Sequence, residues 1–571
     1  MIRQTWKWAI SAAMVVLIIT SLPQLYLCYK RGPEWNGSYY YFDADEFAYS
    51  AYINALIDGR PRRNDPYTGI DNGPYESLYS IQFLPAYSIA VPARIFGISS
   101  SGSFIILGLL ISLTSALALF FFLFEITDNP MLSASAAIGV LCVGALAAQP
   151  PWGWGTISIP FPFLRRYLPA VPFPFFFAMT MFVWRALTRT FLTWSLLAGL
   201  AFLVLIFSYF FLWTAAVGWL VMFTVIWIVV RPRDWWTILR VDAVIALFGI
   251  VALSPYLWLL AHRSPVIEQT QLLEFTHHLD LLRGPELFGI AIAIMIVVFG
   301  KDDLLQRDPK VLLIMSFALA PILVFNQQVI TGRSLQPIHY ERFIANYWSV
   351  TAVFLAFGLK GRNLPKRIPL YLAMASLTIG LTLVIRSTRH YLDSNVEVDK
   401  GRAVALKLKD HEGLAYISNP LTHTLATTSS NPVLWSRYLY TFSNVDLREQ
   451  KLRFYKYLYY SGVAEETLRA SLNGDDLSAR GEIFGLERTG RLLTANFNPL
   501  TVQEIRQAVD EYHAFTSHFD EREAATPLLA YAIVSPADNL SNLDKWYERD
   551  MGKRVGDFII YRLRLKSGNP Q

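Results

Sequence analysis

The chain has 571 residues, of which 53% are hydrophobic and only 16% are charged. Soluble globular proteins usually contain about 25% charged residues, so this composition excludes an ordinary soluble enzyme. The formal net charge of +6 is a weak signal by itself, and no nucleic-acid partner is expected. Two cysteines, Cys28 and Cys142, are too few for a disulfide framework or a zinc site.

Long apolar runs recur over the first two thirds of the chain, each close to the roughly 20 residues that cross a bilayer as a helix. We interpret eleven of them as membrane spans. The first is too long for the apolar core of a signal peptide, usually about 7–15 residues, and we expect it to remain uncleaved. The predicted spans are 9–29, 103–124, 131–149, 170–186, 191–208, 210–230, 241–261, 286–300, 311–330, 343–359 and 368–386.

The loop charges indicate the orientation of these spans, because short cytoplasmic loops are enriched in Lys and Arg. Placing the N-terminus in the cytoplasm puts four cationic clusters inside, and an odd number of spans then puts the C-terminus outside. The clusters are Arg185 and Arg189; Arg231, Arg233 and Arg240; Lys301, Arg307 and Lys310; and Lys360, Arg362, Lys366 and Arg367.

The first outer loop, 30–102, contains two stretches that predict helices. The stretch 45–58 ends at Gly59, with Pro61 just beyond, which is a helix stop signal. The apolar stretch 78–97 contains two prolines, and counting it as a span would reverse every later loop. We therefore expect two helical stretches that lie at the membrane interface.

The tail, 387–571, is richer in charge and alternates strand-like with helix-like patterns, which predicts a small α/β domain on the exoplasmic side. The fold expected is thus mainly α: a polytopic transmembrane domain over 1–386, followed by this second domain. The strand-like stretches are 414–417, 529–534 and 557–563, and the helix-like stretches are 446–460, 464–472 and 502–515.

Three carboxylates, Asp43, Asp45 and Glu46, follow the first span and stand among aromatic residues. Desolvation there would raise the pKa of a carboxyl group, which suits a general base that accepts a proton from a hydroxyl group. The alternative is that Asp43 or Asp45 only caps the following helix. Three acids in a chain so poor in charge favour a functional role.

The helix that begins at Asp45-Glu46 resembles the first outer loop of glycosyltransferase-C enzymes. The closest group is that of the protein O-mannosyltransferases and the bacterial lipid A aminoarabinose transferases. The resemblance covers residues 1–130, and the later spans match only in general architecture. It rests on Asp45, Glu46, Tyr49, Ala51 or Ala55, Leu56 and Gly59, and on the continuation Leu78-Tyr79 to Arg94-Ile95-Phe96-Gly97.

The resemblance implies a polyprenyl-phosphate-linked sugar as donor and an inverting transfer to a hydroxyl group of a glycan, lipid or protein. It places the catalytic base on Asp45, with Asp43 and Glu46 as near alternatives. Asp43-Ala-Asp45 could also hold a divalent cation. The metal-dependent oligosaccharyltransferase branch has further acids in its second outer loop, whereas the loop 150–169 has none, so no cofactor is expected and a metal is not favoured.

The donor phosphate needs cations, which outer loops usually lack. Arg333, His339 and Arg342 cluster in one short outer loop, and Arg165, Arg166 and Arg263 lie in two others. Arginine pairs with phosphate through its planar fork. The alternative is that these residues anchor the chain at the membrane interface. We expect Arg60, Arg62 and Arg63 to be solvated or lipid-facing.

The rival hypothesis is a carrier, either a flippase for lipid-linked glycans or a secondary transporter. Transporters keep ionisable residues at the bilayer midplane and interrupt two matching helices. Here the span interiors are nearly free of charge and the acids collect at the outer surface, which favours an enzyme. The near absence of cysteine favours a bacterial inner membrane, with the N-terminus cytoplasmic and the C-terminus periplasmic.

Overall fold

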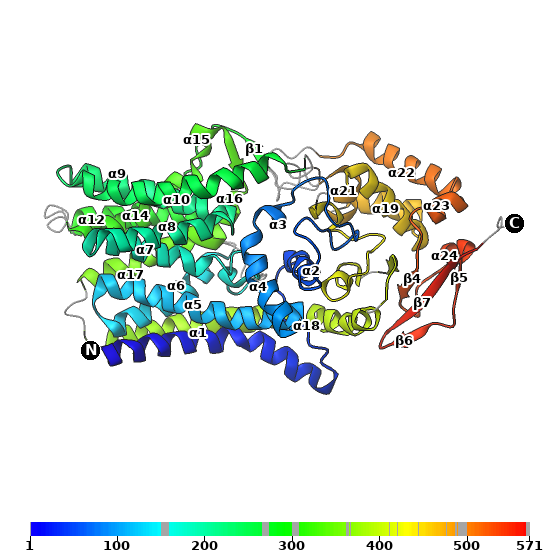
Figure 1. The fold of residues 1–571 in the computed structure, drawn as a ribbon, viewed down its shortest axis with the longest axis horizontal. Helices are drawn as coiled ribbons and strands as arrows, with labels where there is room; N and C mark the ends of the chain where they lie inside the picture. Colours follow the sequence, from blue (N-terminus) through cyan, green and yellow to red (C-terminus); the bar gives the residue numbers. More distant parts are fainter. Residues whose placement is uncertain are drawn as a thin grey trace.

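The computed structural model describes most of the chain. The described residues are 2–149, 159–264, 273–299, 308–360, 365, 367–409, 411–418, 421–442, 445–474, 477–485, 488 and 499–566. Long helices run side by side along the longest axis, with the N-terminus at one end of this bundle and the C-terminal segment at the other (Figure 1). The predicted architecture, a helical bundle followed by an α/β segment, is confirmed.

Each of the eleven predicted spans corresponds to a helix of the bundle. These helices are α1 (Ile2–Arg31), α5 (Ser100–Thr127), α6 (Pro130–Ala147), α7 (Phe173–Thr188), α8 (Phe191–Ile206), α9 (Phe210–Val230), α10 (Trp235–Ala261), α12 (Gly284–Phe299), α14 (Pro309–Phe325), α17 (Asn346–Lys360) and α18 (Arg367–Leu408). The split between α8 and α9, the least distinct boundary in the sequence, falls at residues 207–209.

Not every helix is long enough to cross a bilayer unaided. Among the described residues, 8 helices have the length and hydropathy of a membrane span. Two of these are the stretches Pro309–Thr331 and Pro337–Leu359, which contain α14 and most of α17 together with the short helical turns beside them. The other helices of the bundle, α7, α8 and α12, are apolar helices of 16 residues. At 1.5 Å per residue this corresponds to about 24 Å, less than the roughly 30 Å of hydrocarbon. The helices are therefore confirmed, and the number of spans stays a prediction.

Several predicted inner loops meet at the end of the bundle where α1 begins. Glu125, near the end of α5, accepts a hydrogen bond from Arg189 at 2.8 Å and also pairs with Arg185. Lys310 Nζ donates to the carbonyl of Ile126 at 2.6 Å. The cations at this end thus bind the ends of neighbouring helices together. Four of the other predicted inner cations, Lys301, Arg307, Arg362 and Lys366, lie outside the described residues.

The first loop contains α2 (Asp45–Ile57), α3 (Leu78–Ile81) and α4 (Phe83–Phe96), which confirms both predicted helical stretches. The expectation that its arginines are solvated or lipid-facing is wrong for two of them. Arg62 donates to both oxygens of the buried Glu76, at 2.6 and 2.7 Å. Arg60 pairs with Asp71 at 2.8 Å. Both pairs fold the loop onto itself between α2 and α3.

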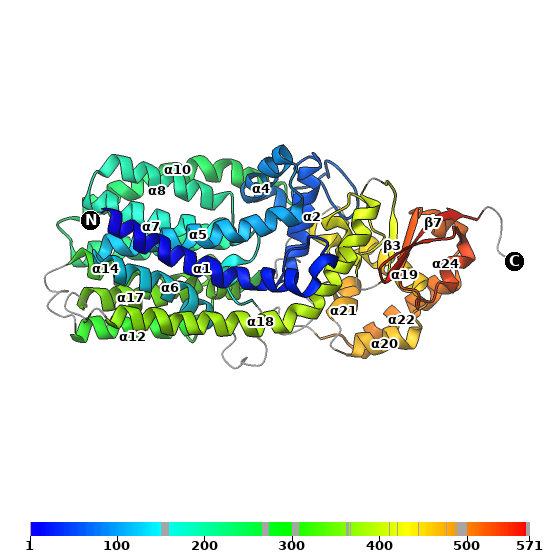
Figure 2. The same cartoon turned by 90° about the horizontal axis from the view of Figure 1, so that it is seen from below.

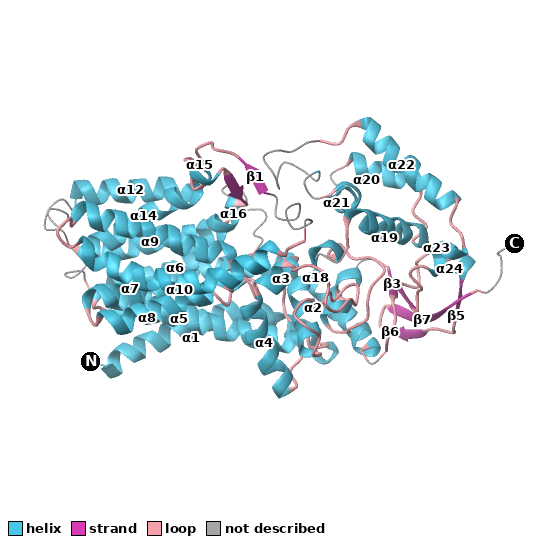
Figure 3. Ribbon diagram, turned by 45° about the horizontal axis from the view of Figure 1, so that its top comes forward, coloured by secondary structure: helices cyan, strands magenta, loops and turns pink. Residues whose placement is uncertain are grey.

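The C-terminal segment contains the larger of the two sheets (Figure 3). Its strands are β3 (Ala415–Ile417), β4 (Tyr531–Val534), β5 (Tyr547–Arg549), β6 (Lys553–Val555) and β7 (Phe558–Leu565), with β3 parallel to β4 and β7 antiparallel to β4, β5 and β6. Its helices are α19 (Leu447–Tyr460), α20 (Glu465–Asn473), α21 (Leu477–Phe484), α22 (Val502–Ser517), α23 (Glu521–Ala525) and α24 (Ser541–Trp546). Every strand-like and helix-like stretch predicted for the tail is an element of that kind.

Helix α18 joins the two parts without a break. It has 42 residues, or about 63 Å at 1.5 Å per residue. It runs along the bundle and continues into the C-terminal side (Figure 2). The predicted division between residues 386 and 387 therefore falls inside a helix, at the point where its apolar run ends, and the division stays a prediction.

Candidate functional site

The candidate site begins with residues 36–41, which connect α1 to the acids and have no regular secondary structure. Side chains from α1 and α18 satisfy the backbone of this segment, as a neighbouring strand would in a sheet. Gln24 accepts from the amide of Tyr40 at 2.7 Å and donates to the carbonyl of Ser38 at 3.1 Å. Asn395 accepts from the amide of Tyr41 at 2.8 Å and donates to its carbonyl at 3.0 Å. The acids therefore follow a segment of fixed position.

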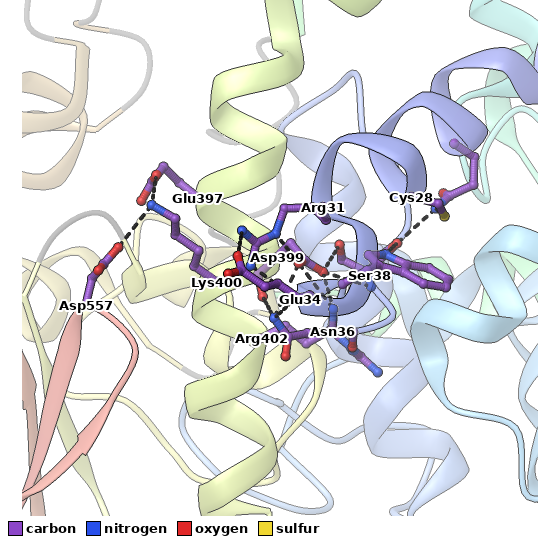
Figure 4. A network of polar contacts seen from close by, with 12 residues as sticks. Cys28, Arg31, Glu34, Asn36, Ser38, Glu397, Asp399, Lys400, Arg402 and Asp557 are labelled. Carbon is purple, nitrogen blue, oxygen red and sulfur yellow. Dashed lines mark hydrogen bonds and ion pairs between the residues drawn. The ribbon is translucent and has the colours of Figure 1, made fainter.

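Asp399 holds the start of the same segment (Figure 4). Its buried carboxylate accepts hydrogen bonds from the amide of Asn36 at 3.0 Å, from Ser38 Oγ at 2.7 Å and from Arg31 Nε at 2.9 Å. Arg402 adds a bond from Nε to the carbonyl of Asn36 at 3.0 Å. A buried charge of this kind is stable only when it is paired and hydrogen-bonded, so the network holds α1, the segment and α18 in one arrangement.

The three acids have different environments. Asp43 Oδ1 accepts from the amide of Asp45 at 2.8 Å, which forms a local turn just before α2. Neither acid is the N-cap residue of the helix, because that position is Ala44, which has no side-chain cap. The side chain of Asp45 is 53% exposed, whereas that of Asp43 is 22% exposed and that of Glu46 is 1% exposed. Of the three acids, Asp45 is therefore the one that a substrate can reach most easily.

Desolvation by the surrounding protein also raises the pKa of two of these acids, the half-exposed Asp45 and the buried Glu46. Protein packed around Asp45 raises its pKa to about 6, the carboxylate of Asp43 adds to this rise, and Arg165 opposes it. Burial raises the pKa of Glu46 to about 8, although Arg166 opposes the change. Near pH 7 Asp45 is therefore mostly an anion that can accept a proton, and Glu46 is mostly neutral.

Arg165 lies directly against the accessible acid. Its Nη1 is 3.0 Å from Asp45 Oδ2 and 3.8 Å from Asp43 Oδ2. The carbonyl of Leu168 accepts from its Nε at 2.8 Å, and the guanidinium lies 4.6 Å from the ring centroid of Phe343. Arg165 is thus a buried cation in a fixed orientation, and interface snorkelling does not describe it.

Arg166 lies beneath α2 and holds the surrounding backbone. It donates to the carbonyls of Phe104 at 2.9 Å and Tyr40 at 3.0 Å, and its Nη1 is 3.7 Å from Glu46 Oε2. A Cβ added to Gly108 would lie 2.8 Å from its Nη2, so the guanidinium packs closely against this glycine. Arg166 is therefore mainly a positioning group for the site.

The residues of the predicted cationic loop separate in the structure. His339, in α16 (Pro337–Tyr340), and Arg342, in the turn Glu341–Ala345 that leads into α17, lie within electrostatic reach of Arg165, and Arg342 also of Asp43. The loop also contains α15 (Gln328–Thr331). Arg333 lies in β2 (Arg333–Leu335), which pairs antiparallel with β1 (Leu273–Phe275), and its backbone also bonds to Gln327 and Thr331.

Arg263 follows α10, where its Nη1 donates to the carbonyl of Leu260 at 3.0 Å. It also forms a backbone bridge with Glu76, so its described contacts tie α10 to the first loop rather than to the acids.

Within the described part of the chain, no group of three or more His, Cys, Asp or Glu side chains is placed to hold a metal ion. The acids instead face arginines. We define the acid–arginine cluster as Asp43, Asp45, Glu46, Arg165, Arg166 and Arg342.

Sequence reasoning did not find Gln24, Asn395, Asp399 and Arg402 as supports of the site. Two features of the sequence pointed to these residues. Gln24 is a polar residue within an otherwise apolar span. Asn395, Asp399 and Arg402 follow one another at spacings of four and three, which places them on one helix face.

Replacing Asn395 with Ala should loosen the segment 36–41, because two hydrogen bonds worth about 0.5–1.5 kcal/mol each are lost. We expect amide hydrogen exchange in this segment to accelerate roughly tenfold or more. The control is Lys400→Ala. Lys400 lies on the same helix as Asn395, and this change removes its ion pair with Asp557 of the C-terminal segment. Unchanged exchange in Asn395→Ala would show that the segment is held by other contacts.

Comparisons with known proteins provide a limited context. No protein-family model matches the sequence, and neither does any curated protein. Among solved structures, the chain is similar to ArnT from Cupriavidus metallidurans bound to undecaprenyl phosphate, at 12% sequence identity and a TM-score of 0.49. The match covers 97% of this chain and 98% of that chain. The case for a function therefore rests on the residues of the site.

Proposed function

We propose that the protein is an integral membrane glycosyltransferase. It moves a sugar from a polyprenyl-phosphate donor to a hydroxyl acceptor at the exoplasmic face, with inversion, and Asp45 is its general base. The observation that carries this proposal is the environment of Asp45. Its carboxyl group has a pKa raised to about 6, is 53% exposed and lies 3.0 Å from a buried arginine.

In this mechanism the acceptor hydroxyl oxygen attacks the anomeric carbon of the donor sugar. The bond between that carbon and the phosphate oxygen breaks, and its electron pair leaves with the polyprenyl phosphate. Asp45 takes the proton of the hydroxyl group, and Arg165 and Arg342 stabilise the charge that develops on the phosphate. Attack from the face opposite the leaving group inverts the anomeric centre.

The charge of the cluster suits an anionic leaving group. Because burial raises the pKa of Glu46 to about 8, this carboxyl group is mostly neutral at pH 7. Arg165, Arg166 and Arg342 then face two carboxylates of the cluster, Asp43 and Asp45. Glu341 also lies within electrostatic reach of Arg342, but it is paired with Arg283 at 3.1 Å. A phosphate group would compensate this excess of positive charge through charge-assisted hydrogen bonds. His339 is a further donor for such a phosphate, because its Nδ1 is buried without a hydrogen-bond partner among the described residues.

Mass spectrometry of lipids that copurify with the protein tests this function. We expect a polyprenyl monophosphate, or its sugar ester, in the wild type and also in Asp45→Asn, because the base is not needed to bind the donor. A lipid-linked oligosaccharide on a pyrophosphate would instead indicate the flippase that the sequence left as the alternative. Absence of polyprenyl lipids from protein extracted in several mild detergents would contradict the proposed donor.

The proposal places the enzyme in a bacterial inner membrane, with the acids and the C-terminal segment on the periplasmic side. The first loop lies at the end of the helical bundle opposite the N-terminus, and the C-terminal segment lies beyond it (Figure 1). A donor lipid would then bring its phosphate to the membrane surface, where the acid–arginine cluster can meet it.

A further inference from the structure

Residues 421–442 of the C-terminal segment pack directly on the helix that carries the acids. Tyr438 donates from its hydroxyl group to the carbonyl of Ala44, the residue before Asp45. The ring of His423 lies 4.4 Å from that of Phe47, between ring centroids. These contacts make residues 421–442 one wall of the candidate site.

Arg437 is the one exposed residue between Asn431 and Leu439. Its neighbours Ser436 and Tyr438 are buried, so its backbone is held firmly. Its guanidinium carbon lies 5.5 Å from the ring centroid of Tyr438, the same ring whose hydroxyl group is bonded to Ala44. The side chain therefore reaches solvent beside the beginning of α2, within electrostatic reach of Asp45.

The groups that face Arg437 do not neutralise it. They are Asp45, His423, Glu482 and the neutral phenol of Tyr67. Asp45 is already paired with Arg165, and burial lowers the pKa of His423 to about 4, so that imidazole is neutral. Glu482 is buried and accepts from Gln450 Nε2 at 2.7 Å. Within the described part of the chain Arg437 forms no ion pair, which leaves its planar fork open toward solvent.

We infer that Arg437 binds an anionic group of a substrate beside Asp45, so that the C-terminal segment forms part of the substrate site. A guanidinium fork binds phosphate or carboxylate through two parallel hydrogen bonds. The group is either the phosphate of the lipid donor or an acidic group on the acceptor. The inference rests on the proposed function, because it takes the acid–arginine cluster as the place where substrates meet.

The test measures binding to the purified full-length protein, with Arg437→Ala and Arg437→Lys compared with the wild type. The matched control is Arg469→Ala, which removes an exposed arginine of α20 in the same segment. The first probe is undecaprenyl phosphate. The second is inorganic phosphate, added to protein already saturated with that lipid. Melting temperatures of all variants should match the wild type, because both arginines are exposed.

If Arg437 holds the donor phosphate, Arg437→Ala should weaken undecaprenyl phosphate binding by roughly 10- to 100-fold, and Arg437→Lys should recover part of the loss. If it holds an acceptor anion, lipid binding should be unchanged, and the binding of inorganic phosphate to the saturated protein should be lost in Arg437→Ala. Normal binding of both probes would overturn the inference. Neither probe requires turnover, so this result is independent of whether Asp45 acts as a base.

Discussion

Replacing Asp45 with Asn should reduce sugar transfer by about 10²- to 10⁴-fold, which is the usual contribution of a positioned general base. The amide keeps the shape of the carboxyl group but cannot accept the proton of the acceptor hydroxyl group. The affinity for the donor lipid should change little. The measurement is the initial rate of transfer at saturating donor, together with donor binding to the same variant.

The pH dependence gives the same prediction a second readout. The base is active when ionised, and its pKa is raised to about 6, so the wild-type rate should fall as the pH drops below 6. This acidic limb should be absent from the residual rate of Asp45→Asn.

The raised pKa of Asp45 also affects the pH dependence of the free energy of unfolding. The native carboxyl group of Asp45 holds its proton more tightly than that of an aspartate in an unfolded chain, whose pKa is about 3.9. Its stabilising contribution is therefore lost as the pH rises through about 6, and Asp45→Asn should not destabilise the protein at pH 7.

Two neighbouring substitutions distinguish Asp45 from the other acids. Asp43→Asn keeps an oxygen that can accept the amide of Asp45, and Glu46→Gln keeps a neutral group in a buried position. Both should reduce transfer less than Asp45→Asn. Full activity of Asp45→Asn would remove it from the mechanism, and loss of activity only in Asp43→Asn would move the base two residues upstream.

Arg342→Ala should weaken use of the donor by roughly 10- to 100-fold, because a charge-assisted hydrogen bond contributes about 1.5–3 kcal/mol. The loss should appear as a higher apparent KM for the donor, a lower turnover rate, or both, with acceptor affinity unchanged. Arg342→Lys should recover only part of the loss, because lysine lacks the planar fork. The measurement is steady-state transfer over a range of donor concentrations.

Arg333→Ala is the matched control for Arg342. Both arginines come from the same short loop, but Arg333 lies in the two-stranded sheet of β1 and β2, whereas Arg342 lies within electrostatic reach of Asp43. We therefore expect Arg333→Ala to retain nearly normal donor use. Equal losses in both variants would mean that the whole loop closes over the phosphate, and normal activity in both would make Arg342 a structural residue.

The helices of the bundle could be predicted because their signal is local. Twenty consecutive apolar residues require a helix wherever lipid is the solvent, whatever the rest of the chain does. The length of α18 could not be predicted in this way. Its apolar run ends near residue 386, but packing against the first loop and the C-terminal segment continues the helix to Leu408.

The acids could be found in the sequence, but their separate roles could not. Asp43, Asp45 and Glu46 are close neighbours in the sequence, and only the way α2 packs exposes one and buries another. Arg437 gave no signal, because an arginine in a charged tail resembles any surface residue. What distinguishes it is the contact between Tyr438 and Ala44, which joins positions 394 residues apart.

The support of the segment 36–41 also sets the order in which the site can form during synthesis. Arg402 and the carbonyl of Asn36, which it binds, are separated by 366 positions. At about 5–20 residues per second, the ribosome needs roughly 20–70 s to cover that distance. Until then the acids have left the ribosome but lack the side chains that fix the backbone before them. The centre is therefore assembled only after the last helix of the bundle has been made, and a nascent chain that stops at residue 386 would carry the acids without Asn395, Asp399 and Arg402.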